Sequence, residues 1–220
     1  GEQTTGEVTE LTTANAKFTY NPSNWTNTDV VATASTDVTG FTIQTSLDGQ
    51  TWSDTPSQTR STNGPVYARL WDGTNAGGML TGNVTKIDKT PATISISATA
   101  TGTSTGTLSA VVDDKESGLS QIKWEWGTNT NYGNSATDKY TSMNGTNAGT
   151  IGSTTKTKSL TGLSAGTTYY VRITAYDVAG ISELAKIPSR DELLSKLLGS
   201  LQSPITNFAR VIKQIAEQGG

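Results

Sequence analysis

The pattern that most constrains the fold is a strand signature that occurs twice in the chain. Apolar residues stand two, four and six positions before Asp72, and again two, four and six positions before Asp177. Because successive side chains of a strand point to opposite faces of its sheet, each run predicts a strand with one buried face. We therefore expect two short all-β modules of one type. The predicted core residues are Val66, Ala68 and Leu70 in the first run, and Val171, Ile173 and Ala175 in the second.

Two further segments have the same alternating character. Ile122, Trp124 and Trp126 fall on one face of a predicted strand, and we expect them to pack in a core. Asp48 followed by Gly49 predicts a hairpin, because a type I′ turn needs positive φ at both central positions. The residues expected on one face before that turn are Phe41, Ile43, Thr45 and Leu47.

The boundary between the modules is predicted at Pro91, which cannot donate to a β ladder and is flanked by charged residues. We expect a leader or linker over residues 1–17, which show no secondary-structure period. Two tandem immunoglobulin-like or fibronectin type III β-sandwiches are expected over residues 18–90 and 91–182. An amphipathic helix is expected over residues 183–220.

Composition excludes several function classes. The chain has no cysteine and no histidine, so it lacks thiolate metal ligands and the commonest general base. Its net charge of -3 is spread without basic clusters, which argues against nucleic acid as a partner. No apolar run approaches the roughly 20 residues that span a bilayer. We predict a protein that is not an enzyme and that uses no cofactor.

Acidic and aromatic residues supply the remaining site candidates. Asp113, Asp114 and Glu116 crowd one predicted turn and are weak calcium candidates, since calcium takes several oxygen ligands from loops. Their spacing does not match helix-flanked calcium loops, so a solvated turn is the simpler interpretation and we predict no metal. Carboxylates adjacent in one turn also do not flank a glycosidase cleft. Trp71 lies opposite the predicted core stripe and is a possible exposed contact.

The stretch "SLTGLSAGTTYYVRITAYDVAG" resembles the part of fibronectin type III domains where a leucine, a glycine turn and a tyrosine lead into strand F. The resemblance implies that Leu163 and Tyr169 are corner residues, with the tyrosine hydroxyl bonded back to the backbone. Residues 18–90, with "WTNTDV", "SLDGQTW" and "VYARLWD", resemble the immunoglobulin-like repeats of bacterial cell-surface proteins. That resemblance implies an extracellular or cell-surface location and a role as spacer or adhesion module.

The end of the chain has a different character. In "SRDELLSKLLGSLQSPITNFARVIKQIAEQ" apolar residues recur at helical spacing, and Ser189 with Glu192 forms a capping box. Such a stripe must be buried, on its own β module, on a second copy of the chain, or against another protein's helices. The predicted partner-binding face is Leu194, Leu197, Leu198, Leu201, Ile205, Phe208, Val211, Ile212 and Ile215.

The segment from about Leu184 to Gln218 also resembles the carboxy-terminal region of the bacterial ribosomal stalk-base protein, the tenth protein of the large subunit. In that family the kinked helix docks dimers of acidic stalk proteins, which implies an alternative function for this chain. The globular RNA-binding domain that precedes the helix in that family is here replaced by β modules, which suggests a fusion. The ligand of the β modules is not predicted.

Overall fold

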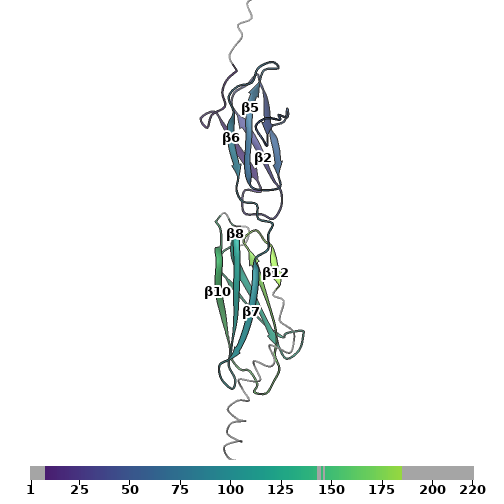
Figure 1. Cartoon of the computed structure of the whole chain (residues 1–220), viewed down its shortest axis with the longest axis vertical. Coiled ribbons are helices and arrows are strands. Elements are labelled where there is room, and N and C mark those ends of the chain that lie inside the picture. Colours follow the sequence, from purple (N-terminus) through teal and green to yellow (C-terminus); the bar gives the residue numbers. More distant parts are fainter. Residues whose placement is uncertain (1–7, 143–144, 146, 185–220) are drawn as a thin grey trace, which may run out of the picture. The chain divides into compact units, whose positions relative to one another are not determined.

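The computed structural model describes residues 8–142, 145 and 147–184 (Figure 1). All regular structure in these residues is β, which confirms the predicted class for this part of the chain. The chain divides into two compact units with the main boundary between Thr90 and Pro91, although residues 145 and 147 group with the first unit; each unit is described by itself. Strand β12 (Ser182–Leu184) overlaps the start of the segment predicted to be helical. The rest of that segment, residues 185–220, lies outside the described residues.

The first unit consists of two antiparallel three-stranded sheets, with strand orders β1-β2-β4 and β3-β5-β6. In the immunoglobulin fold strands A, B and E lie in one sheet and strands C, F and G in the other, which corresponds here to β1, β2, β4 and to β3, β5, β6. The strands are β1 (Ala16–Asn21), β2 (Val30–Thr36), β3 (Thr42–Ser46), β4 (Ser57–Arg60), β5 (Gly64–Trp71) and β6 (Leu80–Val84). This arrangement is that of an immunoglobulin-like sandwich.

The core of the first unit follows the predicted alternation of β5. Val66, Ala68 and Leu70 are fully buried, and the residues between them are only partly buried. Phe18 and Tyr20 of β1 stack with ring centroids 6.4 Å apart and pack against this core. The prediction for β5 is confirmed.

Residues 8–17 are not a leader, contrary to the expectation for residues 1–17. Val8 and Leu11 are buried in the same core cluster as Leu70. Leu11 N donates to the carbonyl oxygen of Gly78 at 3.3 Å, so the segment is tied to the chain just before β6. Two apolar side chains in a polar stretch are too few to produce a period, and tertiary contact alone buries them.

The prediction of a tight hairpin at Asp48 and Gly49 is wrong, because the chain forms a longer loop there. Strand β3 pairs with β5, and a single antiparallel bridge between Thr45 and Ser53 closes a longer loop. Gly49 has a φ of 73°, but Asp48 is not among the described residues with positive φ, so no type I′ turn forms. Leu47 is 39% exposed because the loop begins there. Phe41 and Ile43 pack against the core and Thr45 is buried, as predicted.

The six strands of the second unit form one hydrogen-bonded sheet, in which the two halves of one long strand pair with different neighbours. Residues 106–114 of β8 pair with β7 and β10, whereas residues 121–127 pair with β9 and β11. Figure 1 shows β7 and β10 on either side of β8. The strands are β7 (Thr93–Ala100), β8 (Gly106–Gly127), β9 (Asn134–Lys139), β10 (Thr150–Leu160) and β11 (Tyr170–Asp177), with β12 at the edge beside β11.

The predicted core of the second unit is confirmed. Val171, Ile173 and Ala175 on β11 are buried, and they form one cluster with the buried residues Ile122 and Trp124. Trp126 is partly buried and packs against that cluster. The register places Trp124 opposite Ile173, so the two predicted stripes meet on one face of the sheet.

The tyrosine corner implied by the fibronectin resemblance is also present. The Tyr169 hydroxyl accepts a hydrogen bond from Ser164 N at 3.0 Å, five residues upstream. Leu163 packs against the core cluster beside it. The bond fixes the loop between β10 and β11 to the start of β11.

Candidate functional site

The outer face of the β3-β5-β6 sheet carries an aromatic and cationic cluster. Trp71, predicted as an exposed contact, is partly exposed there, together with Arg69 of the same strand. The Arg69 guanidinium carbon lies 4.1 Å from the ring centroid of Trp52 and 5.6 Å from that of Trp71. Trp52 comes from the loop after β3, directly before Ser53. We call Trp52, Arg69 and Trp71 the Trp–Arg cluster.

A buried amide holds Arg69 in position. Gln44 of β3 stands opposite Arg69 in the strand register and is 8% exposed. Its Oε1 accepts a hydrogen bond from Arg69 Nε at 2.8 Å, and its Nε2 donates to Asp54 Oδ1 at 2.6 Å. The arginine is therefore oriented by a neutral group and by aromatic rings, which leaves its positive charge uncancelled by direct contact.

The second unit has an arginine on the corresponding outer face, but with an anionic partner. Arg172 of β11 stands opposite Glu125 of β8 and binds its carboxylate through Nε at 2.7 Å and Nη2 at 2.8 Å. Lys123 adds an ion pair to Glu125 at 3.0 Å, and Tyr132 stacks on the guanidinium at 4.6 Å. The hydrogen bonds from Arg172 lower the pKa of Glu125 to about 2. The charge of Arg172 is thus largely satisfied within the protein.

The three calcium candidates do not converge. Asp113 is partly exposed and pairs with Lys115 at 2.9 Å, while Glu116 is exposed. Asp114 is buried, and its Oδ1 accepts hydrogen bonds from the backbone N–H groups of Glu116 and Gly118 at 3.0 and 2.8 Å. Alternation along β8 places Asp113 and Asp114 on opposite faces. The prediction that these three residues bind no metal stays a prediction.

A carboxylate that the sequence did not indicate lies near Asp114. Asp177 ends β11, is fully buried, and accepts a hydrogen bond from Ile181 N at 2.8 Å. One carboxylate oxygen of Asp177 lies within 4.8 Å of one of Asp114, a separation at which two carboxylates can share a cation. The position of Asp177 at the end of a strand with a buried apolar face is the sequence signal that could have indicated it. Asp114 and Asp177 are therefore the described pair of the second unit best placed to supply metal ligands.

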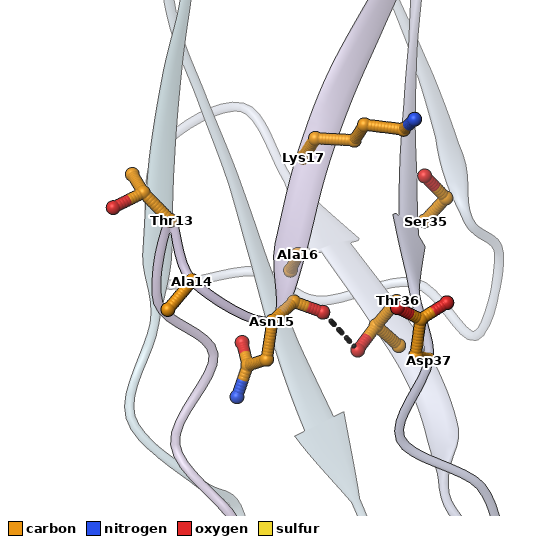
Figure 2. Close-up of a pocket in the computed structure, with 8 residues that line it drawn as sticks. All are labelled: Thr13, Ala14, Asn15, Ala16, Lys17, Ser35, Thr36 and Asp37. Atoms are coloured by element: carbon orange, nitrogen blue, oxygen red, sulfur yellow. Dashed lines mark hydrogen bonds between the residues drawn. The ribbon is translucent and has the colours of Figure 1, made fainter.

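An open depression of about 370 Å³ lies at the end of the β1-β2 ladder in the first unit (Figure 2). Its lining is mostly small and polar, with Lys17 and Asp37 as the charged groups. The Thr36 hydroxyl donates to the Asn15 carbonyl at 2.7 Å and closes one side. The depression can hold water or a small polar group.

Comparison with known proteins gives a match for the end of the chain. Residues 187–219 match the family model described as the ribosomal protein uL10 C-terminal region. Large ribosomal subunit protein uL10 of Burkholderia lata is 57% identical over 42 residues, which cover 19% of this chain and 26% of that protein. The uL10 of Methylibium petroleiphilum is 52% identical over 46 residues, covering 21% and 26%. The chain thus spans about a quarter of the length of these relatives.

Solved structures resemble the β units only distantly. Chicken CNTN1 FN1-FN3 domains cover 83% of this chain at 10% identity and a TM-score of 0.32. A two-domain fibronectin type III segment of chicken tenascin covers 79% at 14% identity and a TM-score of 0.30. Among the described residues, no helix is long and apolar enough to cross a membrane.

Proposed function

We propose that the chain is a non-enzymatic segment of a bacterial cell-surface protein that acts as a spacer or adhesion module. The Trp–Arg cluster on an outer sheet face is the observation that supports the adhesion role. Tryptophan and arginine are enriched among residues that dominate binding energies at interfaces. A sheet face that presents them suits contact with a large ligand better than turnover of a small one.

The use of the carboxylates supports the non-enzymatic part of this proposal. Asp48 accepts hydrogen bonds from the N–H groups of Gln50 and Thr51 at 2.8 and 2.7 Å. Asp72 accepts them from Thr74 and Asn75 at 2.7 and 2.6 Å. Backbone hydrogen bonds lower the pKa of Asp48 to about 2 and lower that of Asp72 as well. Such carboxylates close loops and are poor proton acceptors at neutral pH.

A cell-binding assay and a glycan array with the purified full chain test the adhesion role. We expect binding to at least one cell type or glycan that is saturable and competed by unlabelled protein. Negative results on both would eliminate adhesion and leave the spacer role. A substrate-dependent turnover by the chain would contradict the non-enzymatic proposal as a whole.

The match of residues 187–219 favours a second candidate function, docking to acidic ribosomal stalk dimers. Apolar residues at helical spacing, including Ile205 and Phe208, would supply the contact face. Co-elution of the full chain with purified stalk dimers at micromolar concentration tests this. Ile205→Asp with Phe208→Asp should abolish the complex, whereas Asn207→Asp, which adds a charge off the stripe, should not. No complex with the unaltered chain would eliminate this function.

We also propose that the apolar stripe of residues 193–215 causes self-association unless it folds back on a β unit. Exposure of so many large apolar side chains is costly, since each contributes roughly 1.5 to 3 kcal/mol when fully buried. Light scattering of the full chain, compared with a chain that ends at Ser182, distinguishes these possibilities. Two monomers of equal compactness would contradict both forms of burial.

A further inference from the structure

We propose that the Trp–Arg cluster is a binding site for a carboxylate-bearing saccharide, such as a uronic acid polymer. This inference rests on the adhesion role proposed above and names its ligand class. The ligand carboxylate would bind the guanidinium of Arg69, and the C–H face of the sugar ring would pack on the indole of Trp52 or Trp71.

The first argument is the open hydrogen-bonding capacity of Arg69. Its Nε is engaged by Gln44, but its two terminal nitrogens have no hydrogen bond or ion pair within residues 8–142, 145 and 147–184. Two parallel N–H groups of a guanidinium match the two oxygens of a carboxylate. Arg172 in the second unit uses Nε and Nη2 in this way on Glu125. Because Gln44 already engages Nε of Arg69, the fork that Arg69 offers is a different one, formed by its two terminal nitrogens Nη1 and Nη2.

The second argument concerns the identity of residue 44. Glutamine orients Arg69 by a hydrogen bond without cancelling its charge, whereas the cross-strand partner of Arg172 is a glutamate. A carboxylate at this position would satisfy the arginine internally and compete with an anionic ligand. Gln44 is 8% exposed and Trp52 stacks on the guanidinium, so Arg69 is held in one orientation before a ligand arrives.

The acidic side chains of the loops around Arg69 do not form ion pairs with its guanidinium. Asp54 Oδ1 accepts from Gln44, and the carboxylates of Asp48 and Asp72 accept backbone N–H groups of their own loops. None of the three forms an ion pair with Arg69. They lower the local affinity for anions in general, so a bare anion is a poorer ligand than one that also has an apolar face.

The third argument is the shape and chemistry around the guanidinium. Trp52 and Trp71 are partly exposed and contribute aromatic surface next to Arg69. Tyr67, two residues before Arg69 on the same face of β5, is partly exposed and adds a third aromatic ring to this face, next to Gly49. Aromatic rings favour the C–H face of a pyranose, and a uronate carries its carboxylate on the same ring. The two features of the site thus match one sugar residue.

The test uses the full chain and three acidic oligosaccharides: oligogalacturonate, alginate and hyaluronate. Each is compared with its carboxyl-reduced derivative, which keeps the ring and loses the charge. Isothermal titration and quenching of tryptophan fluorescence measure binding. We expect at least one acidic oligosaccharide to bind tenfold or more tightly than its reduced form. Arg69→Gln and Trp71→Ala should each weaken that binding at least fivefold, whereas Lys17→Gln, the same charge change on exposed β1, should not.

Arg69→Lys separates loss of binding from loss of structure. This variant keeps the positive charge but loses the paired N–H donors of the guanidinium, so it should bind at least threefold more weakly. The melting temperature of its first unit should stay within about a degree or two of that of the unaltered chain. Equal binding by reduced forms, unchanged binding by Arg69→Gln, or no binding by any of the three acidic oligosaccharides would overturn the proposal. If Arg69→Gln still binds cells as the unaltered chain does, adhesion stands and only this site fails. If neither protein binds cells or glycans, adhesion fails as well.

Discussion

The two units share one framework but fill the middle of their cores with different residues. In the first unit Thr45 stands opposite Ala68, four places before Asp72. In the second unit Trp124 stands opposite Ile173, four places before Asp177. Both side chains are fully buried. In the first unit aromatic bulk comes instead from Phe18 and Tyr20 of the first strand. The comparison teaches that alternation, rather than residue size at any one position, sets this fold.

Each of these two buried side chains carries a polar hydrogen that must find a hydrogen-bond acceptor. The Thr45 hydroxyl donates to the Thr55 carbonyl oxygen at 2.8 Å. The Trp124 indole N–H donates to Asp138 Oδ2 at 2.8 Å, and Asp138 Oδ1 accepts from Lys158 at 3.1 Å. A buried donor without a partner would lower the free energy of unfolding by roughly 1 to 3 kcal/mol, so both hydrogen bonds are needed for the packing of these side chains.

Trp124→Ala should have the largest effect. Removal of a fully buried tryptophan costs about 3 to 5 kcal/mol through lost transfer energy and the cavity left behind. Calorimetric or denaturant unfolding should show the second unit melting early while the first unit is unchanged, because each has its own core. Thr45→Ala, at the corresponding place in the first unit, should cost less. Equal losses of unfolding free energy in the two variants would show that Trp124 and Thr45 contribute equally to their cores despite their different sizes.

Gly82→Val tests the aromatic packing of the first unit. A Cβ at residue 82 would lie 2.5 Å from a ring carbon of Phe18 and 2.7 Å from the Tyr20 hydroxyl oxygen. We expect a loss of about 1 to 3 kcal/mol from overpacking, measured by urea unfolding of the first unit. Thr81→Val, one residue away on the exposed face, is the matched control and should change stability by less than about 0.5 kcal/mol. A neutral Gly82→Val would indicate that the rings of β1 are loosely held.

Tyr169→Phe compares the two loops that lead into β11 and β5. The corner hydrogen bond to Ser164 N should contribute about 1 kcal/mol to the second unit. The first unit closes the corresponding loop with Arg60, whose Nη1 donates to the Pro65 carbonyl oxygen at 2.7 Å. Tyr176→Phe removes a hydroxyl from the outer face of β11 and is the control. Equal unfolding free energies for the two tyrosine variants would show that the corner hydrogen bond of Tyr169 does not stabilise the second unit.

The smallest effect concerns pH and the ion pair of the second unit. The folded-state pKa of Glu125 is about 2, below its usual value near 4.5. A lowered carboxyl pKa stabilises the fold above the unfolded-state value, and this contribution disappears as pH falls from about 4.5 to about 2. Because Arg172 is 39% exposed, solvent screening limits the contribution to roughly 1 kcal/mol or less.

Urea unfolding of Glu125→Gln and the unaltered chain at pH 7 and pH 2.5 measures this contribution. The difference between the two proteins should shrink at the lower pH. Gln44→Glu should create the same dependence in the first unit by giving Arg69 an anionic partner. If Gln44→Glu leaves the pH dependence of the first unit unchanged, the proposed equivalence of the two arginines is wrong.

Much of the fold could be predicted because alternation is a local property. The buried faces of β5 and β11, and the shared face of Ile122 and Trp124, follow from side-chain direction along a strand. The tyrosine corner was implied by a short motif within one loop. The segment around Leu11 could not be predicted, since its burial depends on contact with residues nearly seventy positions away.

By itself the sequence determined which face of each main strand is buried, because a period of two is written in neighbouring residues. Only the tertiary structure decided which distant side chains meet. It placed Trp52 on Arg69 and oriented that arginine with a neutral amide, and it brought Asp177 close to Asp114. The reason is physical: strand direction is a local steric property, whereas pairing register and loop path depend on how the whole chain packs.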